Sequence, residues 1–201
     1  MPEHILVIGA TGPVGLQFCN EALSQGHKLT LLVRNPGKLP DDIRNNPRIN
    51  VTEGQLNDKN VLQRVTASGA SIFIHNKPVT DCMKLIFPLL IANKFKRALV
   101  LGTCSFTAPE DKGALKWKAS VVLVKMIGGT AFEEFKGLGE FVTSQDPQEL
   151  KWTLFRVPFL GNGAAAPVSA TYTGSGKDGL FISRKVLWLG CCRRWRRIQS
   201  G

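Results

Sequence analysis

The feature that most constrains the fold of this chain is a glycine-rich turn close to its N-terminus. Residues 9–15 read Gly-Ala-Thr-Gly-Pro-Val-Gly, so that glycine recurs at every third position. The apolar run at residues 4–8 predicts a buried strand before the turn, and residues 13–25 carry apolar side chains at helical spacing after it. A strand that passes through spaced glycines into a helix is typical of the first unit of a dinucleotide-binding α/β sheet.

Strand and helix patterns alternate beyond this first unit. Strand patterns occupy residues 28–33, 49–53, 71–75, 97–101 and 151–157, and helical patterns occupy residues 58–69, 81–94, 115–127 and 131–144. The alternation favours an α/β fold of Rossmann type, in which a doubly wound parallel sheet carries helices on both faces in three layers.

The part of the chain after the sixth strand predicts a small C-terminal substrate lobe. Residues 161–179 are rich in Gly, Ala, Ser and Thr, which predicts a loop or a weak strand pair around residues 170–173. Residues 181–184 predict a last short strand or the start of a helix. We expect one Rossmann domain with its lobe at residues 1–184 and a divergent basic tail at residues 185–201.

Charge, cysteines and hydropathy disfavour several classes of function. The formal net charge is +11, but six basic residues and no acid lie from Arg184 onward, which leaves 20 basic and 15 acidic residues before it. The body is therefore only mildly basic, and nucleic acid is an unfavoured partner. The five cysteines lack metal-ligand spacing, so we expect no metal. Without a membrane-length apolar segment or a secretory pattern, the chain is expected to be cytoplasmic.

The glycine turn predicts the contacts of a dinucleotide. Gly9 and Gly12 allow the backbone to turn tightly and to approach a pyrophosphate, and Gly15 allows the helix to pack closely on the strand. The helix N-terminus then offers N–H groups and partial positive charge to the phosphates. The predicted cofactor contacts here are Gly9, Thr11, Gly12, Pro13, Val14 and Gly15. The alternative is a glycine-rich turn that binds no ligand.

The end of the second predicted strand distinguishes between the two nicotinamide dinucleotides. In an NAD-binding unit an acid at this point binds the ribose 2′-hydroxyl. Here the strand ends in Arg34 and Asn35, and a guanidinium suits a 2′-phosphate because the two form a bidentate, charge-assisted pair. We therefore predict NADP(H) rather than NAD(H), with Lys38 adding charge. The alternative for Arg34 is a solvated charge at a strand end.

The Gly-x-x-Gly-x-x-Gly spacing resembles that of the short-chain dehydrogenase/reductase superfamily. More narrowly, the chain resembles the atypical, NmrA-like branch, which includes flavin and biliverdin reductases. The resemblance covers about residues 4–184 and rests on the segments 8–15, 32–35, 96–101, 152–158 and 182–184 in this order. It implies an NADPH-dependent oxidoreductase acting on a small carbonyl, quinone or flavin-like acceptor. The alternative is a non-catalytic NADP(H) sensor that binds a protein partner.

By resemblance, three further strand ends contribute to the cofactor site. These residues are Asn57 and Asp58 beside the adenine, His75, Asn76 and Lys77 beside the nicotinamide ribose, and Arg156, Val157 and Pro158 in the nicotinamide pocket, with Phe159 covering it. Three of them have a structural alternative: Asp58 is equally suited to cap a helix, His75 to be a buried strand-end residue, and Pro158 to end the strand.

The proton-transfer pair of the standard short-chain dehydrogenases is missing. Those enzymes use a Tyr-x-x-x-Lys pair with a serine, whereas the one tyrosine here, Tyr172, is followed four residues later by Gly176. Thr103 and Ser105 lie where the family has its serine, and they are the predicted catalytic residues, with Thr103 also contacting the cofactor. The alternative is that both are ordinary loop residues. Flavin and biliverdin reductases imply that hydride transfer needs no tyrosine, because the cofactor carries the chemistry.

The tail at residues 185–201 departs from the family's pattern. It contains two tryptophans, two cysteines and four arginines where the family continues into an amphipathic helix. We interpret it as the product of an altered splice or reading frame. The alternative is a basic, aromatic arm that binds nucleic acid or an anionic membrane.

Overall fold

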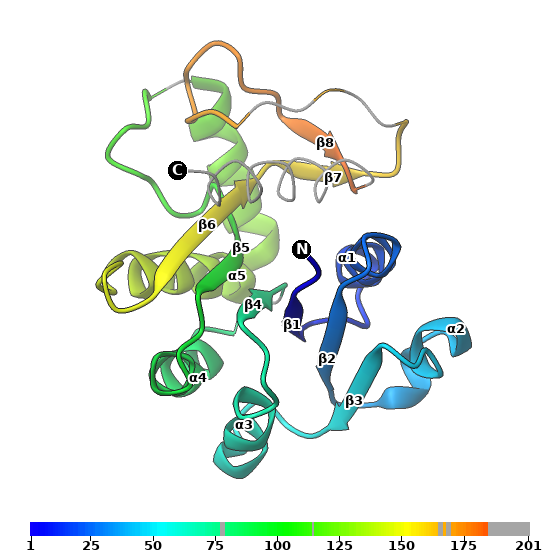
Figure 1. The fold of residues 1–201 in the computed structure, drawn as a ribbon. Coiled ribbons are helices and arrows are strands. Elements are labelled where there is room, and N and C mark those ends of the chain that lie inside the picture. The colour runs from blue at the N-terminus through cyan, green and yellow to red at the C-terminus, as the bar shows by residue number, and fades with distance from the viewer. Residues whose placement is uncertain (77–78, 114, 165–166, 168–169, 185–201) are drawn as a thin grey trace.

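The structure, a computed structural model, describes residues 1–76, 79–113, 115–164, 167 and 170–184 (Figure 1). The strands of the main sheet are β1 (His4–Ile8), β2 (Lys28–Val33), β3 (Ile49–Glu53), β4 (Ile72–His75), β5 (Arg97–Thr103) and β6 (Lys151–Val157). The helices are α1 (Pro13–Ser24), the 3-10 turn η1 (Pro36–Lys38), α2 (Asp41–Arg44), α3 (Lys59–Thr66), α4 (Thr80–Ala92) and α5 (Leu115–Thr143).

The six strands form one parallel sheet in the order β3-β2-β1-β4-β5-β6. The chain builds outward from β1 through β2 to β3, then crosses back and continues from β4 on the other side of β1. This reversal places the topological switch point between β1 and β4, where open α/β sheets bind their ligands at the carboxyl ends of the strands. The predicted doubly wound Rossmann sheet is confirmed.

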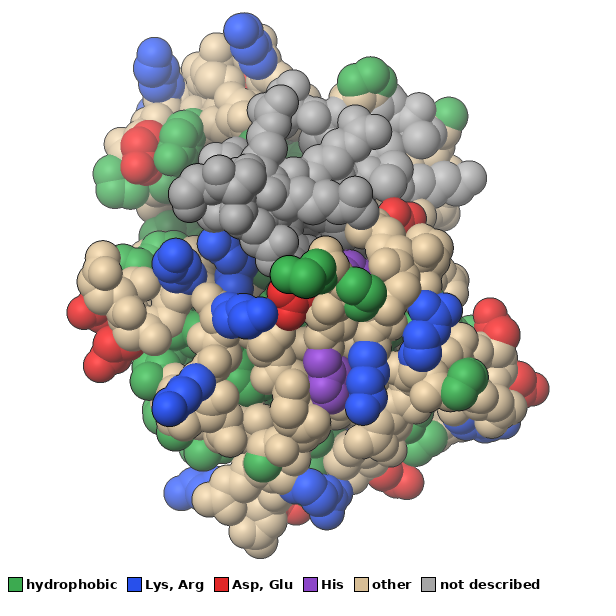
Figure 2. All heavy atoms as spheres, viewed as in Figure 1, with side chains coloured by type: hydrophobic (Ala, Val, Ile, Leu, Met, Phe, Trp, Pro, Cys, Tyr) green, Lys and Arg blue, Asp and Glu red, His purple; other side chains and the backbone are tan. Residues whose placement is uncertain are grey.

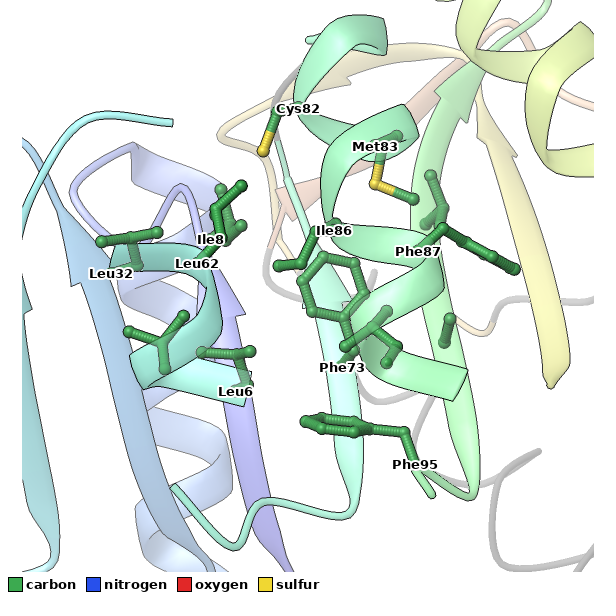
Figure 3. Close-up of a cluster of buried hydrophobic side chains, with 14 of the residues drawn as sticks. Leu6, Ile8, Leu32, Leu62, Phe73, Cys82, Met83, Ile86, Phe87 and Phe95 are labelled. Carbon is green, nitrogen blue, oxygen red and sulfur yellow. The ribbon is translucent and has the colours of Figure 1, made fainter. Parts of the chain in front are cut away.

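Helices cover both faces of the sheet because successive side chains of its buried strands point to opposite faces. Leu6 and Ile8 of β1 belong to one buried cluster, which α3, α4 and α5 complete. Figure 3 shows this cluster, with Leu62 of α3 and Ile86 of α4 among its members. The alternate residues of β1 lie in a second cluster with α1 and α2. The core therefore has the predicted three layers, and the last residues of β1 and β4, Ile8 and His75, are buried.

A small second sheet follows β6. β7 (Phe159–Gly161) and β8 (Phe181–Ser183) pair in parallel, and the ring centroids of Phe159 and Phe181 are 5.6 Å apart. Figure 1 shows this pair beside the carboxyl end of β6. We call this sheet, together with the loops at residues 104–113 and 170–180, the substrate lobe. The lobe lies at the carboxyl edge of the main sheet, on the side of β5 and β6.

Several elements differ in detail from the sequence-based prediction. β5 runs two residues beyond its predicted end, because Gly102 and Thr103 pair with the last residues of β6. The two predicted helical stretches are continuous in α5 except at Gly129, whose non-helical backbone (φ 25°, ψ −95°) separates them. Residues 170–173 form a loop, which is the first of the two predicted alternatives for this segment. The predicted tail at residues 185–201 lies outside the described residues.

The described residues contain neither a helix that could span a membrane nor a cluster of metal ligands. In the part of the chain that the structure describes, no helix is long and apolar enough to cross a membrane. Over the same residues, no group of three or more His, Cys, Asp or Glu side chains is arranged to hold a metal ion. On the face seen in Figure 2, lysine and arginine side chains are spread over several elements, with acidic and apolar side chains among them.

Candidate dinucleotide-binding site

The glycine turn joins β1 to α1 through a backbone conformation that favours glycine. Gly9 has a φ of 88°, in the left-handed region, and its carbonyl oxygen accepts a hydrogen bond of 3.3 Å from the N–H of Gly12. Gly12 is the N-cap of α1, and Pro13 begins the helix. Pro is suited to this position because its fixed φ is already helical. The sequence thus produces the expected strand, tight turn and helix.

Gly15 is the point at which helix and turn approach most closely. A Cβ atom on Gly15 would lie 2.2 Å from the carbonyl oxygen of Gly9 and 2.8 Å from the Cα atom of Ala10. Any side chain there would force the helix away from the turn. A Cβ on Gly12 would meet the same oxygen at 3.7 Å, an ordinary contact. Gly15 therefore serves packing, whereas Gly12 keeps the outer face of the turn bare.

The N-terminus of α1 suits a phosphate group. No described side chain caps it, and no acidic residue lies in its first turn. Backbone N–H groups and the helix dipole attract anions at such an end. The bare turn and the helix end together form a cradle lined by backbone, which fits the pyrophosphate of a dinucleotide.

Arg34 lies at the carboxyl end of β2 and is exposed. Its neighbour Asn35 is the N-cap of η1, where its Oδ1 atom accepts a hydrogen bond of 2.9 Å from the N–H of Gly37. Asn35 therefore holds the backbone that follows Arg34. The first acidic residue after β2 is Asp41, so that no acid occupies the strand end itself.

Asp58 has the capping role that was one of its two predicted alternatives. Its Oδ1 atom accepts hydrogen bonds from the N–H groups of Asn60 (2.9 Å) and Val61 (3.3 Å), at the start of α3. Asn57, just before it, is exposed. Contacts of these two residues with an adenine ring stay a prediction.

The end of β4 lies directly beside the glycine turn. His75 is fully buried, with its ring centroid 6.1 Å from that of Phe73. The N–H of Asn76 donates a 3.0 Å hydrogen bond to the carbonyl oxygen of Ile8, the residue before Gly9. The predicted contact Lys77 lies outside the described residues. Asn76 is thereby fixed at the switch point between β1 and β4.

Hydroxyl groups gather at the end of β5. The Oγ atoms of Thr103 and Ser105 are 3.0 Å apart, and the N–H of Ser105 donates to Oγ1 of Thr103 at 3.3 Å. Between them, burial raises the pKa of the Cys104 thiol to about 11, so that this thiol is protonated at neutral pH. The segment can therefore offer hydroxyl hydrogen bonds but no thiolate nucleophile.

The end of β6 is anchored by an ion pair. Both terminal nitrogens of the Arg156 guanidinium donate to the carboxylate of Asp111, and Nη2 does so at 2.7 Å. The two side chains are only 11% and 6% exposed. Burial alone would raise the pKa of Asp111, but hydrogen bonds from Arg156, Ala108 and Thr173 lower it to about 2. In this structure the guanidinium thus binds the loop at residues 104–113, while Val157 is buried and Pro158 separates β6 from β7.

Two carboxylates that the sequence analysis did not single out, Asp111 and Asp178, connect the loops of the substrate lobe. Asp178 accepts hydrogen bonds from Nε1 of Trp117 and from the N–H groups of Gly174 (2.8 Å) and Gly176 (3.0 Å). The hydrogen bond from Trp117 is the main cause that lowers the pKa of Asp178. Neither acid lies in a recognisable motif, and their partners are distant in sequence. The hydrogen bonds of these two acids therefore hold the loops of the lobe in place, next to Thr103.

The loop at residues 104–113 also packs against α5. The carbonyl oxygen of Phe106 accepts a 3.1 Å hydrogen bond from Nη1 of Arg156. The Phe106 side chain packs on Gly139 of α5, where a Cβ atom would lie 2.4 Å from the Cγ atom of the phenylalanine. The absence of a side chain at position 139 thus allows the loop to lie close to the helix.

A parallel sheet with this strand order, and a bare glycine cradle next to its switch point, defines a dinucleotide-binding domain of Rossmann type. Residues 9–187 match the model of the NAD(P)H-binding family. The chain belongs to this NAD(P)H-binding family.

Solved structures show the same fold. A short-chain dehydrogenase/reductase from Veillonella parvula in complex with NADP has a TM-score of 0.70 and 17% identity, over 100% of this chain and 88% of the other. ChuY, an anaerobilin reductase from Escherichia coli O157:H7, has a TM-score of 0.72 and 14% identity, over 94% and 89% of the two chains. The Bordetella bronchiseptica enzyme WbmG in complex with NAD has a TM-score of 0.59 and 16% identity, over 84% and 57%. At these identities the likeness concerns the fold. No curated protein matches the sequence.

Proposed function

We propose that this protein is an NADPH-dependent oxidoreductase that reduces a small carbonyl, quinone or flavin-like acceptor. The observation that carries the proposal is the position of Arg34. It follows the last residue of β2, at the same carboxyl end of the parallel strands as the bare glycine cradle. The cradle fits a pyrophosphate, and Arg34 stands where NAD-binding units have an acid. Membership of the NAD(P)H-binding family supports a nicotinamide dinucleotide as the cofactor.

The preference for NADPH rests on charge. A guanidinium pairs with a 2′-phosphate through two parallel charge-assisted hydrogen bonds, which a 2′-hydroxyl cannot match. Arg34 is exposed and therefore accessible to a ligand, and Lys38 in η1 is exposed close behind it. The solved relatives include complexes with NADP and with NAD, so the discrimination must come from this chain's own residues.

The substrate would lie between the end of β5 and the substrate lobe. Bound NADPH would supply the hydride. Ser105 and Thr103 would hold the acceptor's oxygen through their hydroxyl groups, and the proton would come from water. The one tyrosine, Tyr172, is 49% exposed in the lobe and has no lysine four residues later, so it is not assigned a role in proton transfer.

A panel of acceptors tests this activity. Purified protein is mixed with NADPH and with quinones, flavins or small carbonyl compounds, and the loss of NADPH absorbance is followed. We expect turnover with at least one class and a fall of about tenfold or more in kcat/KM when Ser105→Ala and Thr103→Val are combined. Ser24→Ala is the control, because Ser24 is exposed at the end of α1, where its hydroxyl donates to the Glu21 carbonyl. Failure of the whole panel with protein that binds NADPH would contradict an oxidoreductase.

The second candidate is a non-catalytic NADP(H) sensor that binds a protein partner. The missing Tyr-x-x-x-Lys pair favours it, because a sensor needs the cofactor site without proton chemistry. This function would give cofactor binding without turnover, together with capture of a partner that depends on whether NADP⁺ or NADPH is bound. Equal behaviour with both forms and no captured partner would contradict it.

A further inference from the structure

The first half of α5 carries a row of exposed apolar side chains. These side chains are Leu115 (83% exposed), Ala119, Val122 (57%) and Met126 (80%). They are four, three and four positions apart, and an α-helix turns once every 3.6 residues, so that all of them lie on one side of the helix. Trp117 lies on the opposite side and is buried. The helix therefore packs on the protein through one side and presents this row, which we call the apolar stripe, on the other.

The shape of the apolar stripe suits a partner helix. At about 100° per residue, its four side chains span only about 60° of the helix circumference. A row this narrow, with apolar residues alternately three and four positions apart, is the pattern of a coiled-coil seam rather than of a helix that lies on a membrane. At about 1.5 Å per residue the stripe is roughly 17 Å long. It ends before Gly129, where the backbone leaves the helical conformation. The stripe therefore fits a helix of about 14 residues.

The charges beside the apolar stripe indicate the chemistry of the partner. Residues 112–132 contain four lysines and no acid. Lys118 and Lys125 are exposed along one border of the stripe, and in the described part of the chain neither forms an ion pair. Lys116, on the other border, is paired with Asp178 at 3.4 Å. A partner helix with acidic side chains beside its own apolar row would complement the two unpaired lysines.

The same charges disfavour two other occupants of the apolar stripe. A second copy docked through its own stripe would bring further lysines, and no acid, to this surface. Residues 185–201 contain four arginines and one lysine without an acid, so that they too would bring like charge. Like charges placed opposite each other weaken an interface.

We propose that the apolar stripe is a docking surface for an acidic amphipathic helix of a different protein. Apolar side chains of that helix pack on Leu115, Val122 and Met126, and its carboxylates pair with Lys118 and Lys125. This mode of recognition needs apolar anchors at helical spacing, which the stripe provides. The inference does not depend on the proposed cofactor function, because the stripe lies outside the glycine cradle.

Two designed peptides test this docking surface. Each is a fluorescein-labelled peptide of two heptads with Leu at positions a and d, and it carries either Glu or Lys at positions e and g. Fluorescence anisotropy with the full chain measures binding. We expect the Glu peptide to bind wild-type protein at least about tenfold more tightly than the Lys peptide. Val122→Glu and Met126→Glu should each weaken the Glu peptide by about tenfold or more, because the new charge is buried against its leucines. Gln63→Glu is the control, since it adds the same charge at an exposed position of α3. Lys118→Glu combined with Lys125→Glu should reverse the preference between the peptides.

Several outcomes would overturn the proposal. These are no binding of the Glu peptide, equal binding by wild-type protein and Met126→Glu, and an unchanged preference after both lysines are reversed. A wild-type dimer that Met126→Glu dissociates in sedimentation would assign the stripe to a second copy instead. Binding to phosphatidylserine vesicles that Met126→Glu abolishes, without peptide binding, would assign it to a membrane. Circular dichroism checks that each variant is folded, and if a Glu variant is not, Val122→Ser and Met126→Ser decide by the same titrations.

Discussion

Arg156 and Asp111 form a bidentate ion pair that joins the last strand of the main sheet to the substrate lobe. The two residues are 45 positions apart in the chain, and both side chains are almost completely buried. The same carboxylate accepts hydrogen bonds from the N–H groups of Ala108 (2.8 Å) and Thr173 (3.1 Å). The Asp111 side chain therefore connects β6, the loop at residues 104–113 and the loop at residues 170–180, and the arrangement of the substrate lobe next to Thr103 depends on it.

Replacing this carboxylate should destabilise the protein. Asp111→Asn keeps the size of the side chain but leaves the buried guanidinium of Arg156 without a counter-charge, which we expect to lower the free energy of unfolding by about 3 kcal/mol. Asp41→Asn is the matched control, because the Asp41–Arg44 pair is exposed and such pairs contribute about 0–1 kcal/mol. Urea denaturation gives both values. Equal stabilities of the two variants would show that the buried pair does not anchor the lobe.

The same carboxylate should make the stability depend on pH in the acid range. The pKa of Asp111 is about 2 in the folded protein, below its ordinary value of 3.8. The unfolded chain therefore takes up the proton first, and the stability that the ion pair provides is complete above pH 3.8 and is lost as the pH falls toward 2. We expect the urea midpoint of the wild type to fall across this window, and that of Asp111→Asn to fall less. Parallel pH profiles would argue against the pair as the cause.

The glycine turn gives a contrast between packing and binding. Gly15→Ala places a methyl group where the Gly9 carbonyl lies, so we expect a loss of stability of roughly 2 kcal/mol or more. Gly12→Ala meets only an ordinary contact, so we expect a change below about 1 kcal/mol but weaker NADP⁺ binding, because the methyl group faces the approaching pyrophosphate. Thermal melts and calorimetric titration separate the two effects. Equal stability of the two variants would refute the different roles given to these glycines.

Much of the fold could be predicted from the sequence because its signals are local. The glycines at positions 9, 12 and 15 lie between a strand and a helix, and the remaining strands alternate with helices in the order that a parallel sheet requires. Asp58 was recognised as a possible helix cap because capping depends on residues only two or three positions away. Gly129 likewise separates the two helical stretches that the sequence predicts.

The rest of the lobe could not be predicted, because it depends on contacts between distant residues. Asp111 meets Thr173 at a separation of 62 residues, and Asp178 meets Trp117 at a separation of 61. Neither pairing leaves a periodic pattern in the sequence. Pro158 ends β6 as predicted, but β7, which directly follows it, is only three residues long and has no strand pattern of its own in the sequence.

The glycine cradle is proposed to bind NADPH, and Arg34 is proposed to select NADPH over NADH. Calorimetric titration of wild-type protein, Arg34→Ala and Arg48→Ala with NADPH and with NADH tests this claim most directly. Arg48 is a suitable control because it is exposed just before the first residue of β3. It therefore lies at the amino-terminal end of the parallel strands, whereas Arg34 lies at their carboxyl end. We expect wild-type protein and Arg48→Ala to bind NADPH at least about tenfold more tightly than NADH, and Arg34→Ala to bind both equally. Wild-type protein that binds neither dinucleotide, or an Arg34→Ala variant that keeps the full preference, would contradict the account.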